Sequence, residues 1–451
     1  MKKVAIGGGQ GFWGDSPDAA IHMIRNADIQ YMGCDYLAEL TLSIMAKQQL
    51  KDPTKGFAPD FTTRILKEAG KEAWDKHIKI CTNAGGMNIN GCVDGIRQWA
   101  EGNSMSGYKI GYVTGDNIKD KIPQLLKDGW TFPNFDYDGN FNDILDKIYN
   151  CNVYIGHEGI EGCLAEGADV VITGRAADSA LFLAPLKYEF GWAADDWDNL
   201  ARGIMAGHLL ECGGQGAGGN YMYDRMDELG FPIAELTDDT FEITKAPDCG
   251  GIICEQSCKE QFLYEVHDPA NYLTPDVNVD ISHATITQVG DNRVRIGGVK
   301  GKPRPDTLKL CVGYHKGWKT VSMLSFAWPD AYEKAQYCAE VIMKKMQRRG
   351  MKADDIHISY IGLNSLHLGV ADMSEEALKN LNECVLRIAV FSEDKSECAK
   401  IIPEISPLQL NGPPGASFFG GRARVQEVMA LWPTTVPRDA VQVESHILEV
   451  K

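Results

Sequence analysis

The sequence contains no long uninterrupted hydrophobic run. Its first three residues, Met-Lys-Lys, precede a short apolar stretch that ends in glycines at Gly7. This stretch is shorter than the hydrophobic segment of a secretion signal. Nothing approaches the ~18 consecutive apolar residues that a membrane-spanning helix needs. We therefore expect a cytoplasmic protein without a membrane anchor.

Basic residues are also scarce. The 451 residues include 45 Lys or Arg against 62 Asp or Glu, so the formal net charge is −17. This charge repels phosphates and anionic lipid, and we expect neither nucleic acid nor a membrane as a partner. The apolar share of 44% and the charged share of 24% exclude the disordered and fibrous classes. The chain is longer than a single hydrophobic core usually supports, which indicates two domains.

Cysteine is plentiful, with 13 residues, but the spacing is irregular. In a chain without a secretion signal, this pattern predicts free thiols in a reducing cytoplasm. Cys249, Cys254 and Cys258 follow the spacing C-x₄-C-x₃-C, which resembles iron–sulfur ligation but matches no standard ligand set. Whether these three bind anything is left open.

Short apolar runs alternate with helical patterns through the first 200 residues. Each run ends in glycine and polar residues before the next helical pattern begins. Such alternation predicts an α/β fold with a largely parallel sheet, flanked by helices in three layers. The runs cover residues 4–6, 30–32, 78–81, 108–113, 153–155 and 170–173.

The pattern changes near residue 280. Residues 284–288 and 293–296 alternate as in a β-hairpin, and two further strands are expected at 308–314 and 321–326. A helix is expected at 331–349. Strands followed by a helix are typical of an α+β domain. We therefore expect an α/β domain over residues 1–282 and a smaller α+β domain over residues 283–451.

Polar residues gather directly after the runs of the first domain. Loops that follow parallel strands share one edge of the sheet, where ligands bind in such folds. Loops after parallel strands are commonly polar and rich in glycine, even without a function. In this chain, however, acids, amides, His and Arg occur together in these loops, which favours an active site. The residues we expect to bind the substrate are Gly9, Gln10, Gly11, Asp15, Asn83 and Arg175.

Residues 9–14 have the spacing G-x-G-x-x-G of a dinucleotide-binding loop. However, Phe12 and Trp13 put two large rings inside the loop, and Asp15 adds negative charge where a pyrophosphate would lie. We therefore expect no nicotinamide cofactor. The backbone N–H groups of the next helix favour a small anion such as a carboxylate instead.

Two pairs of titratable residues are candidates for acid–base catalysis. His157 and Glu158 lie between glycines, and imidazole titrates near neutral pH. Alternatively, Glu158 merely suits the start of the next helix. His208 and Glu211 share a face of a helix expected at 197–212. They would transfer protons or hold a divalent metal, unless His208 is a hydrogen-bonded core residue.

Arg175 and Asp178 open the helix that follows the last run. A guanidinium grips a carboxylate with two parallel hydrogen bonds, so Arg175 is a candidate anchor. The competing interpretation is a structural Arg–Asp ion pair. The full set of candidate catalytic residues is His157, Glu158, Asp178, His208 and Glu211. The metal and its ligands stay unknown.

Five longer motifs, taken together, resemble the acyclic terpene utilisation (AtuA-like) family. They occur in the family's order and extend over much of the chain. The cysteine triplet is not part of the family pattern. The motifs are ITGRAAD at 172–178, AGHLLECG at 206–213, EQFLYEVHDP at 260–269, YLTPDV at 272–277 and GKPRPDTLK at 301–309.

The resemblance implies a role in the breakdown of branched terpenoid acids, by a poorly defined reaction. Many relatives carry a small α+β domain, either fused or as a separate chain. The present chain ends at Lys451 and is expected to lack it, so we expect a small partner protein and an oligomer. Some relatives neighbour genes for methyl-branched dicarboxylates and CoA transfer, which is an association only.

These observations favour a lyase, namely a hydratase or dehydratase of a small branched unsaturated carboxylic acid such as mesaconate or citramalate. Arg175 and the loop at 9–14 would anchor the anion, and His157 or His208 would move protons. A divalent cation held by nearby carboxylates would assist. The alternatives are an enzyme acting on an acyl-CoA and a non-catalytic accessory or scaffold subunit.

Overall fold

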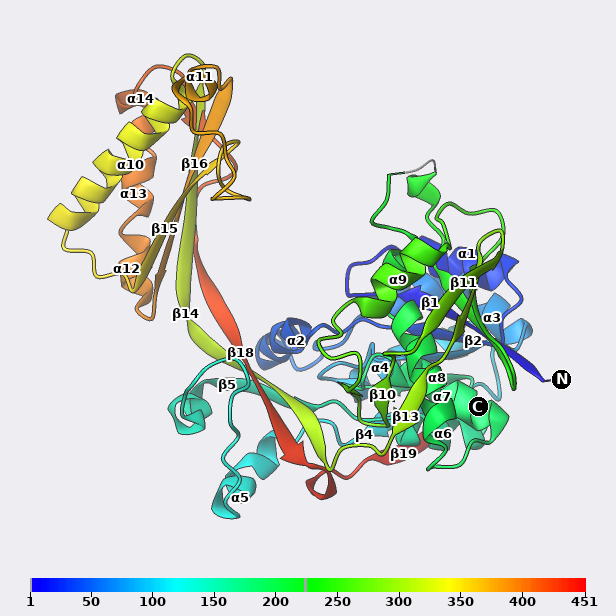
Figure 1. Cartoon of the computed structure of the whole chain (residues 1–451). Helices are drawn as coiled ribbons and strands as arrows, with labels where there is room; N and C mark the ends of the chain where they lie inside the picture. The colour runs from blue at the N-terminus through cyan, green and yellow to red at the C-terminus, as the bar shows by residue number, and fades with distance from the viewer. Residues whose placement is uncertain (1, 223–224) are drawn as a thin grey trace. The chain divides into compact units, whose positions relative to one another are not determined.

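The computed structural model describes residues 2–222 and 225–451, which form two compact units (Figure 1). The first comprises the chain up to Tyr314 together with Leu431–Lys451, and the second comprises His315–Ala430. The boundary expected at residue 282 thus lies inside the first unit. The hairpin just beyond it joins the first unit's sheet by strand pairing. Neither unit has a described helix that is long and apolar enough to cross a membrane.

The first unit is built on a mixed sheet that has ten strands in the described chain. Five neighbouring strands at its centre are parallel, and those toward both ends pair antiparallel. In spatial order the strands are β11 (Thr285–Gly290), β12 (Arg293–Gly297), β8 (Phe241–Lys245), β7 (Pro232–Thr237), β1 (Lys3–Gln10), β2 (Tyr31–Cys34), β3 (Lys79–Thr82), β6 (Val170–Thr173), β4 (Lys109–Thr114) and β19 (Glu444–Glu449).

The sheet differs from the expected one in two respects. It is mixed rather than largely parallel, because β7, β8, β11, β12 and β19 pair antiparallel. In addition, the run at 153–155 adds no strand to it. That run begins at the last residue of β5 (Ile148–Val153), which pairs antiparallel with β14 (Thr307–Ala327). An apolar run indicates that a strand forms, but distant residues decide its partner.

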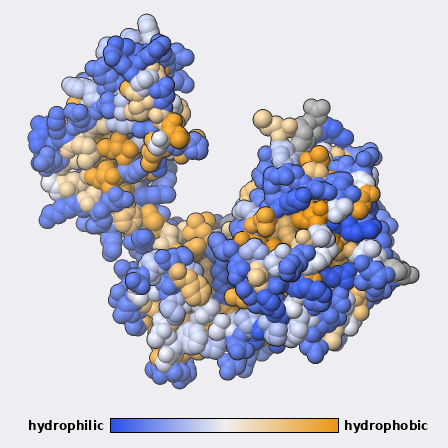
Figure 2. Space-filling model, viewed as in Figure 1, coloured by the Kyte–Doolittle hydropathy of each residue, from blue (hydrophilic) through white to orange (hydrophobic). Residues whose placement is uncertain are grey.

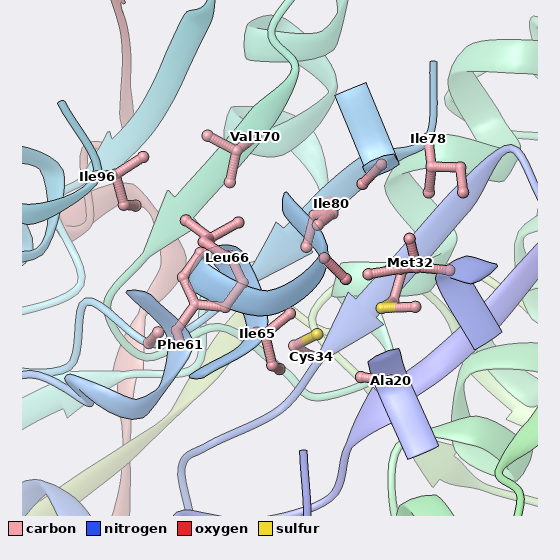
Figure 3. Packing of buried hydrophobic residues seen from close by; sticks show 14 of the residues in the cluster. Ala20, Met32, Cys34, Phe61, Ile65, Leu66, Ile78, Ile80, Ile96 and Val170 are labelled. Carbon is pink, nitrogen blue, oxygen red and sulfur yellow. The ribbon is translucent and has the colours of Figure 1, made fainter. Parts of the chain in front are cut away.

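Helices cover both faces of the sheet. In β2, Met32 belongs to an apolar cluster with residues of α1 (Asp18–Asn26) and η1 (Phe61–Gly70). The neighbouring Gly33 faces Phe182 of α7 (Ala180–Phe190). Successive strand residues point to opposite faces, so these helices lie on opposite sides. Figure 3 shows Met32 and Phe61 inside the cluster. The elements are α1 (Asp18–Asn26), α2 (Glu39–Lys51), the π-helix η1 (Phe61–Gly70), α3 (Lys71–Asp75), α4 (Ile89–Gly102), α5 (Ile122–Lys127), α6 (Glu158–Ala165), α7 (Ala180–Phe190) and α8 (Trp197–Leu210).

Replacement of Gly33 by Ala should destabilise the first unit by about 1–3 kcal/mol through overpacking. A Cβ at this position would lie 2.3 Å from Cε1 of Phe182, whose ring is fully buried. Chemical denaturation checks this, with Gly102→Ala at the end of α4 as the matched control, since a Cβ there meets no atom within 4 Å. An equal fall in the free energy of unfolding of both variants would contradict the explanation by overpacking.

Three short strands form a further small sheet in the first unit, in the order β13, β10, β9. They hold the segment that follows α9. This segment contributes to the site described below. The elements are α9 (Glu255–Leu263), β9 (Tyr272–Leu273), β10 (Asn278–Asp280) and β13 (Lys300–Lys302).

The second unit is an antiparallel sheet with helices packed on one face. In its core, Leu324 of β14 and Leu386 of β16 (Glu383–Ser392) belong to the same apolar cluster as Ile342 of α10 (Ala331–Arg348). β14 is one strand of 21 residues where the sequence predicts two, and α10 ends one residue before the expected end. The elements are α10 (Ala331–Arg348), β15 (Asp355–Ile361), α11 (Glu375–Lys379), β16 (Glu383–Ser392), α12 (Lys395–Ala399), α13 (Ile402–Ile405), α14 (Leu408–Asn411), β17 (Ala416–Phe418) and β18 (Val425–Pro437).

Candidate active site

A cavity of about 580 Å³ lies in the first unit. Its wall combines segments from the ends of strands and helices that are far apart in the sequence. Apolar and aromatic side chains line much of it, and charged groups converge on the remainder. The lining residues that bear on the chemistry are Glu39, Tyr154, Asp178, Glu211, Glu265, His267, Tyr272 and Lys309.

One wall is organised around Tyr154, which directly follows β5. The Arg175 guanidinium lies 3.9 Å from the ring centroid of Tyr154, and the Lys309 ammonium lies 4.6 Å from it. Glu39 accepts hydrogen bonds from the Tyr154 hydroxyl and from Lys309. Burial alone would raise the pKa of Glu39, but the two cations outweigh it and lower the pKa to about 2. This wall therefore keeps Glu39 ionised and presents a cation to the cavity.

Asp178 lies next to this wall and pairs with a buried cation. Nη1 of Arg175 donates to Oδ1 of Asp178 at 2.7 Å and also to the backbone carbonyl of Leu37. Arg175 is only 1% exposed, so it reaches the cavity through Asp178. Behind the pair, burial and the nearby Asp178 raise the pKa of Asp35 well above its ordinary value. The side-chain amide of Asn83 donates a hydrogen bond to Asp35 and holds the loop that follows β2 in place.

A further part of the wall carries a buried acid–base pair at the end of α8. Nδ1 of His208 lies 2.9 Å from Oε1 of Glu211, and Glu211 lines the cavity. Burial raises the pKa of Glu211. Burial alone would lower the pKa of His208, but the charge of Glu211 outweighs it and raises the pKa. The pair therefore holds its shared proton more tightly than either group would alone in water, and it lies next to Asp178.

His157 and Glu158 do not line the cavity. Nδ1 of His157 lies 2.8 Å from Oδ1 of the buried Asp276, and its Nε2 lies 3.4 Å from Glu161. Burial alone would lower the pKa of His157, but Asp276 and Glu161 raise it to about 9. Glu158 pairs with Arg304 at the surface. Through its bond to Asp276, His157 thus holds in place the turn whose residues Thr274 and Pro275 line the cavity.

The glycine-rich loop at 9–14 also lies outside the cavity lining. The carboxylate of Asp15 accepts from the backbone N–H groups of Gly11 and Ser16 at 3.0 and 2.8 Å. The side-chain amide of Gln10 donates to the Ser16 carbonyl. Asp15 therefore occupies two backbone N–H groups of this loop, where an anion was expected. Gly9 belongs to β1, where a Cβ would lie 2.6 Å from the sulfur of Cys34.

No group of three or more His, Cys, Asp or Glu side chains in residues 2–222 and 225–451 is arranged to hold a metal ion. The cysteine triplet serves the local structure. The sulfur of Cys254 accepts from the N–H of Ser257 and caps α9, and that of Cys249 contacts the Ala246 carbonyl at 3.0 Å. Cys258 is buried in the same helix.

Two of the residues chosen from the sequence, Asp178 and Glu211, line one cavity. Their partners, Arg175 and His208, lie behind them. Tyr154, Tyr272 and Lys309 also line the cavity, and none of them is among the site residues expected from the sequence. A signal existed for two of them, because Tyr272 opens the motif YLTPDV and Lys309 closes GKPRPDTLK. Glu39 and Asp35 both follow β2, but acids after a strand carry no distinguishing signal by themselves.

A comparison with models of protein families matches residues 4–447 to the family described as acyclic terpene utilisation family protein AtuA. Searches of curated proteins and of solved structures found no match. The match spans nearly the whole chain and includes every residue of the cavity. The protein is therefore a member of the acyclic terpene utilisation family AtuA.

Proposed function

We propose that the protein is a carbon–oxygen lyase that adds water to, or removes it from, a branched unsaturated carboxylic acyl compound. The observation that carries the proposal is one cavity with two carboxyl groups in different environments. Glu211 is backed by His208, and Asp178 is paired with Arg175. Carboxyl groups held in contrasting environments are a recurrent arrangement for a general acid and a general base.

The reaction follows from this division of roles. In hydration, Asp178 accepts a proton from water while the water oxygen bonds to the β carbon of the substrate. The carbon–carbon double bond becomes single, and the Glu211–His208 pair supplies a proton to the α carbon. Negative charge that develops on the acyl oxygen faces the Lys309 ammonium in the same cavity. Dehydration is the reverse of these steps.

The cavity favours a substrate with a long apolar part and at most one negative charge. The described lining residues carry four carboxyl groups, one ammonium and one imidazole. A dicarboxylate such as mesaconate would place its second charge among these carboxylates. A volume of 580 Å³ is typical of pockets for larger organic ligands. Family membership points the same way, because acyclic terpenes are branched, unsaturated chains.

Incubation in ¹⁸O-labelled water with a panel of acids tests the proposal. The panel comprises branched α,β-unsaturated acids of increasing chain length, free and as CoA thioesters, with mesaconate as the dicarboxylate. We expect one ¹⁸O atom in the hydroxyl of a long branched product. Glu166→Gln, at an exposed carboxylate beyond the cavity, should leave this unchanged. Turnover of mesaconate alone would refute the substrate class, and no ¹⁸O in any product would refute the reaction.

A further inference from the structure

The second unit contains a cavity of its own, of about 370 Å³. It lies between β14, the short helices α13 and α14, and the loop after β17. Figure 2 shows hydrophobic surface on this unit over α13. Its apolar lining comes from Met323, Ile402, Ile405 and Phe418. Nothing in the reaction proposed above uses this cavity.

A buried hydroxyl without a partner marks the inner part of this cavity. Ser322 lines the cavity and is 3% exposed, yet its Oγ has no hydrogen-bond partner among the described residues. A buried polar group without a partner is costly, and native structures rarely keep one without a reason. A ligand with a hydrogen-bonding group would satisfy this hydroxyl.

An arginine without an ion pair marks the outer part. Arg422 is exposed, lines the same cavity and forms no salt bridge with the described residues, in a chain whose net charge is −17. It follows Gly420 and Gly421, which line the cavity with their backbone. A guanidinium in this position suits a carboxylate, which it can bind with two parallel hydrogen bonds.

We propose that this cavity binds a small amphipathic acid. Its apolar chain lies along Ile402, Ile405 and Phe418, and its carboxylate pairs with Arg422. A hydroxyl or carbonyl at the far end of the chain bonds to the Ser322 hydroxyl. The site is separate from the catalytic cavity, and it holds whether or not the reaction proposed above is correct.

Calorimetric titration of the full chain tests this site with two matched series of probes. One series is straight-chain carboxylic acids of about six to ten carbons, and the other is the ω-hydroxy acids of the same lengths. We expect the best hydroxy acid to bind about fivefold more tightly than the plain acid. Ser322→Ala should abolish this difference, and Arg422→Gln should weaken both acids about tenfold.

Three controls show whether the acids bind in this cavity. Arg424→Gln removes an exposed arginine that does not line the cavity, and it should leave both affinities unchanged. Lys309→Gln, in the catalytic cavity, should leave the preference for the hydroxy acid unchanged. The melting temperature of Ser322→Ala should not fall, because the hydroxyl has no partner to lose. Absence of binding or equal loss of affinity in both arginine variants would overturn the proposal. So would loss of the hydroxy-acid preference in Lys309→Gln, or a melting temperature of Ser322→Ala lowered by several degrees.

Discussion

Glu211→Gln is expected to lower kcat by about a thousandfold while the fold stays intact. The amide keeps the shape of the carboxyl group and a hydrogen bond to His208, but it cannot supply a proton to the α carbon. General acid–base groups typically contribute ~10²–10⁴ in rate. Steady-state kinetics on the acid identified by ¹⁸O labelling gives kcat, and circular dichroism checks the fold.

The pH dependence of kcat sharpens this prediction. Both the Glu211 and the His208 pKa are raised, so the pair keeps its shared proton to a higher pH than either group would alone in water. The hydration rate should therefore decline on the alkaline side in the wild type. The residual rate of Glu211→Gln should lack this decline. A variant with wild-type kcat and an unchanged pH profile would exclude Glu211 as the acid.

Asp276→Asn is expected to lower the free energy of unfolding by about 3 kcal/mol near pH 6. The rise of the His157 pKa from 6.5 to about 9 corresponds to about this energy, because each pKa unit is worth ~1.4 kcal/mol. The pair is buried, since both residues are less than 5% exposed. Removal of the carboxylate leaves the imidazolium buried without its counter-charge.

The stabilisation by this pair should depend on pH in a defined direction. His157 in the unfolded chain loses its proton near pH 6.5, but the folded protein keeps it to about pH 9. The contribution is thus complete below about pH 6.5, declines as the pH rises and is gone above about pH 9. The pKa of Asp276 is lowered by His157 despite its burial, so its contribution is lost as the pH falls below about 4.

Urea denaturation of wild type and Asp276→Asn from pH 4 to pH 10 measures this difference. The two curves should converge above about pH 9. The double variant His157→Gln with Asp276→Asn removes both charges and should be less destabilised than Asp276→Asn alone near pH 6. A destabilisation that is constant over the whole pH range would show that lost packing, and not the ion pair, is responsible.

The sequence predicts those site residues whose partners are near in the chain. His208 and Glu211 share a helix face at a spacing of three, and Asp178 lies three residues after Arg175, so local geometry places them together. The central strands and most helices of the first unit are likewise local patterns, and α10 is predicted almost to the residue.

The rest depends on contacts between distant segments. Lys309 and Glu39 are separated by 270 residues, and they meet only because β5 pairs with β14 and not with the large sheet. Because His157 lies between glycines after an apolar run, the sequence predicts that it is catalytic. Its structural role depends instead on the bond to Asp276, 119 residues later. No local pattern encodes such pairings, because many strand partners satisfy the same short apolar run.

The most direct test of the account is deuterium incorporation during a single turnover in D₂O, followed by proton NMR. We predict one deuterium at the α carbon of the hydrated product for the wild type. We also predict a rate of incorporation about a thousandfold lower in Glu211→Gln, and a comparable loss in Asp178→Asn. Incorporation at the wild-type rate in both variants would contradict the assignment of this cavity as the active site.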